Sequence, residues 1–287
     1  MSKLFKRLNS GEPALGTLLL ASSPEWVDIA GTVGLDFICI DLMFGSVDWD
    51  RAAHMMRAAK MYDMTPMIRL QGYPWGGNPD QRTLADLNRA LSIGAESVTM
   101  SLDTPAEVAS MLPLARDPHR YIHLYTSYEV KGQGEPNTAT SAAERETLKQ
   151  LEDRMEAQTL IMPLLESSGA IAQIDEILAV KGLRAVFLGL GDLSRRGVVG
   201  SPGNMEHPDT TALVGKIARS GRSRGVHVFT IAGLQDTPER ALERARLLWN
   251  AGVDGIFLPM FTFLVQRFHE KALPLIRSEL AKETREK

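Results

Sequence analysis

Four charged side chains stand directly after short apolar runs. Asp41 and Arg69 each close one such run, and Glu166 and Asp192 follow two later ones. A charge buried at the end of an apolar run costs several kcal/mol unless it has a partner. Two carboxylates and a guanidinium that converge could bind a divalent cation together with an anionic or carbonyl substrate. The structural alternative is an Arg–carboxylate network that only closes one end of the fold.

Short apolar runs must position these side chains. They alternate with stretches of helical periodicity, and most are apolar on both faces, as expected of parallel strands covered on both sides. The nine runs are residues 14–20, 37–42, 66–70, 97–101, 121–126, 160–165, 185–190, 226–231 and 256–260. Nine strands are one too many for an eight-stranded barrel. We expect 121–126 to be accessory, because a long polar stretch follows it.

A repeated junction joins helices to strands. Glycines at positions 34, 94, 182 and 252 each precede two turn residues and then a buried strand. This repetition predicts a (β/α)8 TIM barrel, with a doubly wound open sheet as the alternative. We expect one domain over residues 1–287, with an inserted or accessory segment at 117–143 and a C-terminal helix and tail at 261–287.

Helix starts are marked by a hydroxyl residue followed by proline. Ser23, Thr104 and Thr237 each stand in that position. Such a residue can accept a hydrogen bond from the first turn, and proline suits the first helical position. Thr104 with Glu107 also predicts a capping box.

Composition limits the partners. The chain has 287 residues, with 32 Lys+Arg against 35 Asp+Glu and a net charge of −3, so we expect no nucleic-acid partner. The single cysteine, Cys39, excludes an internal disulfide and fits a reducing cytosol. The basic N-terminus lacks a following apolar core, so neither a signal peptide nor a membrane span is expected. These features favour a cytoplasmic protein with a small-molecule substrate.

Several segments resemble the HpcH/HpaI aldolase family, the class II pyruvate-type aldolases of a barrel superfamily that also includes citrate lyase β-type enzymes. The resemblance extends in order from about Leu15 to Leu275. Its most specific part is similar to the family's G-P-A-D-L-S. The segments are Gly16-Thr-Leu-Leu-Leu, Gly34-Leu-Asp-Phe-Ile-Cys-Ile-Asp41, Pro66-Met-Ile-Arg69, Pro163-Leu-Leu-Glu166 and Phe187-Leu-Gly-Leu-Gly-Asp192-Leu-Ser.

The resemblance implies roles for individual residues. Glu166 and Asp192 would hold Mg²⁺, Mn²⁺ or a similar cation, and Arg69 would stabilise the enolate oxygen. The backbone N–H groups of Gly191 and Asp192 would bind the substrate carboxylate. A cation and an arginine both act on charge that grows in the transition state. The resemblance also implies a homo-oligomer, a hexamer or trimer, in which the C-terminal helix packs on a neighbour.

One departure removes a general base. The family reads D-x-E-H after its strand-two aspartate, whereas this chain reads Asp41-Leu-Met-Phe44 and has no histidine there. A well-placed base contributes roughly 10²- to 10⁴-fold to the rate. The candidate replacements are His123, Tyr125, Tyr128, Glu129 and Asp41 acting through a water. The sequence leaves the choice among them open.

Other departures make polar positions apolar. Leu42, Met43, Phe44, Leu164 and Leu190 stand where relatives are polar. Drift at supporting positions is the plainer explanation. The functional one is a pocket for a bulky or aromatic substrate, which makes Phe44, Leu190 and Trp75 substrate-binding candidates. Trp75 lies in an aromatic loop after Arg69, a kind of loop that is more often a lid or an interface.

The predicted function is a divalent-metal-dependent carbon–carbon lyase. It would cleave a hydroxylated carbonyl compound or 2-oxo acid by a retro-aldol reaction through a metal-bound enolate, with Arg69 and Asp41 as catalytic residues. Two alternatives stay open: an enolate-forming decarboxylase of a β-keto acid, and a non-catalytic ligand-binding barrel. The substrate and the preferred metal are not determined by the sequence.

Overall fold

A computed structural model describes residues 2–71, 81–116, 130–131, 146–200 and 202–282. Within these residues, eight parallel strands close into a barrel in the order β1-β10-β9-β8-β7-β4-β3-β2. The barrel strands are β1 (Ala14–Leu19), β2 (Phe37–Asp41), β3 (Thr65–Arg69), β4 (Ser97–Ser101), β7 (Leu160–Leu165), β8 (Ala185–Leu188), β9 (His227–Ile231) and β10 (Gly255–Leu258). Closure through β1, which pairs with both β10 and β2, confirms the (β/α)8 fold and excludes the open sheet.

The structure describes little of the segment that was predicted to be inserted or accessory. Residues 121–126 and most of 117–143 are outside the described residues. Within that segment, β5 (Val130–Lys131) pairs in parallel with β6 (Glu146–Thr147) as a separate two-stranded sheet. Eight of the nine apolar runs therefore correspond to the barrel strands.

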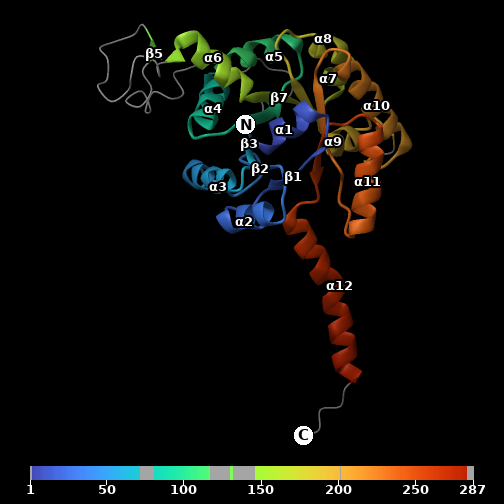
Figure 1. The fold of residues 1–287 in the computed structure, drawn as a ribbon. Coiled ribbons are helices and arrows are strands. Elements are labelled where there is room, and N and C mark those ends of the chain that lie inside the picture. Colours follow the sequence, from blue (N-terminus) through green and yellow to red (C-terminus); the bar gives the residue numbers. More distant parts are fainter. Residues whose placement is uncertain (1, 72–80, 117–129, 132–145, 201, 283–287) are drawn as a thin grey trace.

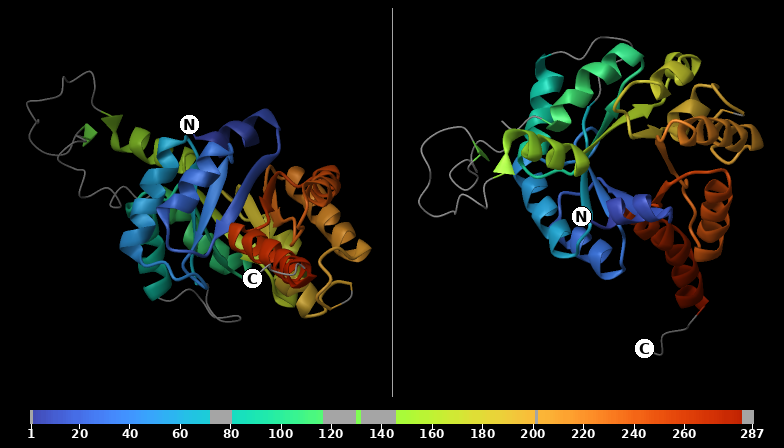
Figure 2. Two further views of the ribbon diagram at one scale, coloured as in Figure 1. Left: turned by 90° about the horizontal axis from the view of Figure 1, so that it is seen from below. Right: turned by 45° about the horizontal axis from the view of Figure 1, so that its top comes forward.

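Most helices surround the barrel on its outside (Figures 1 and 2). The first helix instead packs its apolar residues Leu4, Phe5 and Leu8 against the residues of the barrel interior. The helices are α1 (Lys3–Ser10), α2 (Pro24–Thr32), α3 (Trp49–Met61), α4 (Gln81–Ser92), α5 (Pro105–Met111), α6 (Leu148–Ala157), α7 (Ser168–Ala172), α8 (Ile174–Leu178), α9 (Leu190–Arg195), α10 (Pro208–Arg222), α11 (Pro238–Asn250) and α12 (Phe261–Lys282), with the 3₁₀ helix η1 (Leu112–Arg116) after α5.

Two of the three expected helix caps form. Thr104 and Glu107 make the predicted capping box at α5, and Thr237 accepts from the Arg240 N–H at α11. Ser23 is the N-cap residue of α2 and Pro24 its first helical residue, as expected, but the Ser23 side chain makes no cap hydrogen bond and its hydroxyl bonds the Glu25 side chain instead. The Ser23 hydroxyl is the donor in this bond, whereas a cap requires its oxygen to accept from a backbone N–H.

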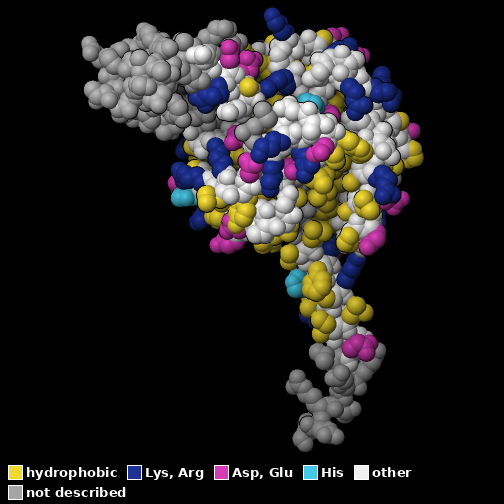
Figure 3. All heavy atoms as spheres, viewed as in Figure 1, with side chains coloured by type: hydrophobic (Ala, Val, Ile, Leu, Met, Phe, Trp, Pro, Cys, Tyr) yellow, Lys and Arg dark blue, Asp and Glu magenta, His cyan; other side chains and the backbone are white. Residues whose placement is uncertain are grey.

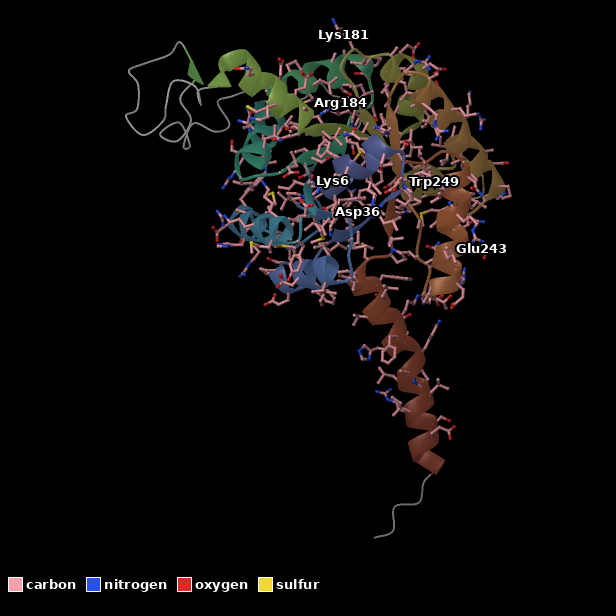
Figure 4. The ribbon with its side chains drawn as sticks, viewed as in Figure 1. Lys6, Asp36, Lys181, Arg184, Glu243 and Trp249 are labelled. Atoms are coloured by element: carbon pink, nitrogen blue, oxygen red, sulfur yellow. The ribbon has the colours of Figure 1, made fainter. Side chains whose placement is uncertain are left out.

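Charged side chains fix the strand starts. Asp36, labelled in Figure 4, accepts a hydrogen bond from the Leu15 N–H at 2.9 Å. Asp254, at the same place in the repeated junction, accepts from the Val228 N–H at 2.8 Å. Arg184, also labelled in Figure 4, donates to the carbonyl oxygens of Glu156 and Thr159. At these three junctions, side-chain as well as main-chain hydrogen bonds therefore connect neighbouring segments.

The barrel interior is filled by aromatic rings. Phe187 stacks on Phe257 with centroids 4.6 Å apart, and Phe37 meets Phe257 edge-on at 4.9 Å. Gly16 permits this packing, because a Cβ there would lie 2.4 Å from the Phe37 ring. The filled interior leaves the carboxyl ends of the strands as the place for a site, as in other barrels of this kind.

The last helix, α12, projects away from the barrel (Figure 1). Figure 3 shows hydrophobic side chains along it and around its base. Its exposed apolar residues are Leu264, Val265, Phe268, Leu273, Leu275 and Ile276. Among the described residues, no helix is both long and apolar enough to cross a membrane.

Candidate active site

The charged residues predicted from the sequence gather at the carboxyl ends of the strands. Asp41 ends β2 and Arg69 ends β3, in direct register with each other. Glu166 follows β7, and Asp192 lies in the first turn of α9. Arg69, Glu166 and Asp192 line one cavity of about 320 Å³. Parallel strands bring these four positions to one end of the barrel although up to 151 residues separate them in sequence.

Apolar side chains form most of the cavity wall. Four charged side chains, those of Arg69, Glu166, Asp192 and Arg195, interrupt it. The apolar lining consists of Leu18, Phe44, Leu164, Phe187, Met205, Ile231, Leu234, Phe257, Leu258, Pro259 and Met260. A mainly apolar pocket with a few convergent polar groups is typical of a small-molecule site.

The Asp41 carboxylate forms its hydrogen bonds with other groups of the protein. Its side chain is fully buried. Oδ1 accepts hydrogen bonds from the N–H groups of Met43 at 2.7 Å and Phe44 at 3.0 Å, and Oδ2 accepts from Arg69 Nη1 at 3.3 Å. The cavity lining does not include Asp41, so its carboxylate holds the loop after β2 and orients Arg69. This placement favours a positioning role over the predicted exchange of protons.

Arg69 has one strong partner and several weak ones. Besides its ion pair with Asp41, Nη2 donates to Met43 Sδ at 3.4 Å. The guanidinium carbon lies 5.1 Å from the centre of the Phe44 ring. Nε is buried and has no hydrogen-bond partner in the described part of the chain. Because a thioether is a weak acceptor, Nη2 is available to a stronger one. No sequence pattern predicted the contact between Met43 and Arg69.

Glu166 is a buried carboxylate in a polar corner of the cavity. It is 5% exposed, and its Oε1 accepts a hydrogen bond from Ser101 Oγ at 2.5 Å. Burial raises its pKa above the ordinary value, and the nearby Asp192 charge raises it further, against opposing effects from Ser101 and Arg69. Ser101 was not among the predicted site residues, although a polar residue that ends a strand was a usable signal.

Gly189 allows Glu166 to sit where it does. A Cβ at position 189 would lie 2.8 Å from Glu166 Cβ and 3.0 Å from its Oε2. Such distances are too short for an unshifted side chain. The glycine therefore keeps open the space that the Glu166 carboxylate occupies.

The acidic pair fits a hard divalent cation. Glu166 and Asp192 line the same cavity, and burial, together with a smaller repulsion from the Asp192 charge, raises the Glu166 pKa. Bound positive charge would relieve that repulsion, and carboxylate oxygens are the donors that Mg²⁺ and Mn²⁺ prefer. In the described residues, no group of three or more His, Cys, Asp or Glu side chains is arranged to hold a metal. Further ligands would have to come from substrate or water.

Only some of the remaining predicted site residues line the cavity. Phe44 and Gly191 line the cavity. The Asp192 N–H already donates to the Gly189 carbonyl oxygen at 3.1 Å, so a substrate carboxylate could bind it only if that bond broke.

Leu190 does not line the cavity; its side chain is fully buried in the core between strands and helices. Trp75, His123, Tyr125, Tyr128 and Glu129 lie outside the described residues.

Comparisons with known proteins identify the family of the chain. The family model described as HpcH/HpaI aldolase/citrate lyase matches residues 15–259. The chain is 26% identical over 255 residues to 2-keto-3-deoxy-L-rhamnonate aldolase of Escherichia coli (strain K12), covering 88% of each chain. It is 24% identical over 259 residues to hydroxypyruvate/pyruvate aldolase of Pseudomonas aeruginosa, covering 90% of this chain and 89% of the relative.

A solved structure extends the similarity to the fold. The HpcH/HpaI aldolase from Desulfitobacterium hafniense DCB-2 matches with a TM-score of 0.73 and 22% identity, over 96% of this chain and 97% of that one. The named relatives support an aldolase-type carbon–carbon lyase. The family match covers most of the chain, and the protein therefore belongs to the HpcH/HpaI aldolase/citrate lyase family.

Proposed function

We propose that this protein is a divalent-metal-dependent lyase that cleaves a hydroxylated 2-oxo acid by a retro-aldol reaction. The observation that carries the proposal is one cavity in which the Arg69 guanidinium and the carboxylates of Glu166 and Asp192 meet. Two relatives named as aldolases, one of them a hydroxypyruvate/pyruvate aldolase, support the reaction class.

The reaction places its growing charge where Arg69 can act. In a 4-hydroxy-2-oxo acid the hydroxyl proton leaves, the C3–C4 bond breaks, and an aldehyde is released. The bonding electrons move to C3 and the C2 oxygen, and protonation at C3 gives the product 2-oxo acid. Arg69 donates hydrogen bonds to the developing enolate oxygen, in a cavity whose apolar wall strengthens the interaction. A divalent cation at Glu166 and Asp192 would supply Lewis-acid polarisation of the substrate carbonyl.

Asp41 supports this chemistry from behind Arg69. Its two oxygens are occupied by two backbone N–H groups and by Arg69 Nη1. We propose that Asp41 positions the guanidinium. The candidates for the proton acceptor are then His123, Tyr125, Tyr128 and Glu129. The apolar wall further supports a substrate with a bulky or aromatic substituent.

The proposal is tested with the purified full chain and Mg²⁺ or Mn²⁺. We expect aldol cleavage that EDTA abolishes, loss of metal binding in Glu166→Gln, and a rate about 10²- to 10³-fold lower in Arg69→Ala. Arg57→Ala, an exposed arginine on α3, is the matched control. Full activity after metal removal would exclude the metal requirement. Decarboxylation of oxaloacetate without aldol cleavage would support the decarboxylase in place of the aldolase.

We also propose that the protein is a homo-oligomer, a trimer or hexamer, in which α12 packs on another copy. Phe268 on this helix is 67% exposed and Leu275 is 66% exposed. An apolar groove of about 360 Å³ beside the base of α12, lined in part by Val33, Leu35 and Leu264, supports self-association. Sedimentation of Phe268→Asp should show a smaller species than wild type. An unchanged sedimentation coefficient would refute the role of this face.

A further inference from the structure

Phe44 stands at the cavity in a position that folding does not explain. Its side chain is 68% exposed, yet it lines the cavity and its ring lies over the Arg69 guanidinium. Burial of a phenylalanine side chain stabilises a protein by about 1.5–3 kcal/mol, and most of this is not gained at such an exposed site. The ring is thus left available for contact with another molecule.

The backbone beneath the ring is held firmly. The Asp41 carboxylate accepts hydrogen bonds from the N–H groups of both Met43 and Phe44. Gly45 follows in close contact, since a Cβ there would lie 2.3 Å from the Asp41 carbonyl oxygen and 2.9 Å from that of Leu20. The Ser46 N–H donates to Leu20 at 3.1 Å. The loop therefore presents Phe44 from a fixed backbone, which reduces the entropy lost on binding.

The same loop leaves Arg69 ready to exchange partners. Met43 Sδ accepts from Nη2 at 3.4 Å, and a substrate oxygen can replace this weak acceptor without breaking the Asp41 ion pair. A substrate whose oxygen reaches Nη2 comes close to the aromatic face of Phe44. The neighbouring group of that substrate meets Phe44 and other apolar lining residues, including Leu234 and Met260.

We propose that Phe44 is a specificity-determining residue that favours substrates whose released aldehyde carries an aryl group. This inference rests on the proposed lyase function, narrows the substituent to an aryl group on the released aldehyde, and names the residue that selects it. Offset stacking on Phe44 would favour a substrate with a flat aromatic ring. Hydroxyl groups of a sugar-like substituent would lie against apolar walls without partners, which disfavours them.

The test compares two aldehydes in the aldol direction. Wild type and Phe44→Ala are assayed with pyruvate, Mn²⁺ and either benzaldehyde or glycolaldehyde. We expect wild type to prefer benzaldehyde in kcat/KM, and Phe44→Ala to lower that preference about tenfold or more. Phe44→Tyr should retain it. Met61→Ala, which removes an 84% exposed apolar side chain on α3, is the control and should leave the preference unchanged.

Exchange of the pyruvate C3 protons in D₂O separates this inference from the proposed function. Exchange in wild type and Phe44→Ala, with a fall in kcat/KM for benzaldehyde alone, supports Phe44 as the specificity residue. Exchange with equal losses for both aldehydes overturns the inference and leaves the lyase intact. Absence of both exchange and aldol formation in wild type overturns the lyase itself, and with it this inference. A changed sedimentation coefficient in Phe44→Ala would mark Phe44 as a subunit contact and also overturn the inference.

Discussion

Replacing Asp41 with asparagine should destabilise the barrel and misplace Arg69. The substitution keeps the shape of the side chain and one carbonyl oxygen, which can still accept from the N–H groups of Met43 and Phe44. The amide nitrogen then faces Arg69 Nη1, so two donors oppose each other where an ion pair of 3.3 Å existed. Because Asp41 is fully buried and the Arg69 side chain is 11% exposed, water cannot compensate effectively.

The expected loss follows from the cost of leaving a buried charge without its partner. Breaking such a pair by changing one member costs about 3–5 kcal/mol. Average unfolding entropies per residue make 1 kcal/mol worth roughly 1.7 °C for a chain of this length, so the melting temperature should fall by roughly 5–8 °C. Asp41→Ala should lose more, since two loop N–H groups would also lose their acceptor, at about 1–3 kcal/mol each.

Thermal unfolding at fixed protein concentration measures this loss, because self-association would otherwise shift the transition. Asp48→Asn is the matched control: Asp48 caps α3 through the Arg51 N–H, and asparagine caps a helix as well as aspartate. A cycle with Arg69→Met should give a coupling energy of at least about 1.5 kcal/mol. If the melting temperature of Asp41→Asn falls by less than about 1 °C, or if the effects in the cycle are additive, the positioning role is refuted.

Three further predictions concern Glu166, Gly189 and Thr104. Burial raises the Glu166 pKa above its unfolded value, so the cation-free protein should lose stability as pH rises through that pKa. Glu166→Gln should remove this loss. If the melting temperatures of wild type and Glu166→Gln change in parallel from pH 4 to 8, the prediction is wrong. Gly189→Ala should displace Glu166 and weaken Mn²⁺ binding about 10- to 100-fold by calorimetry, whereas unchanged affinity would exclude Glu166 as a ligand. Thr104→Ala should cost about 1 kcal/mol in denaturant unfolding through loss of the capping box, and no change would show the box to be unimportant.

Much of the fold was predictable because it depends on local patterns. Runs that are apolar on both faces became barrel strands, and glycines such as Gly34 and Gly252, with φ of 88° and 100°, end helices where the repeated junction requires it. A charge directly after a buried strand must lie at the strand's carboxyl end. For that reason the sequence predicted Arg69, Glu166 and Asp192 at one end of the barrel, where all three line the same cavity.

The failures arose where a side chain's environment comes from distant segments. Leu190 looked like a pocket residue from its place in the motif, but the start of α9 turns it into the core, while Gly189 and Gly191 line the cavity. Ser101 contacts Glu166 across β4 and β7, a pairing of residues 65 positions apart.

The sequence by itself determined the barrel, the end of it that carries the site, and the charged residues gathered there, since apolar runs alternate with helical stretches and a repeated glycine junction joins them. Only the tertiary structure decided what those charges do to each other. Asp41 was a catalytic candidate in sequence, and its contacts place it behind Arg69, where both oxygens are occupied. The physical reason is that hydrogen bonding and burial depend on which atoms meet in space, and spacing along the chain does not specify those contacts.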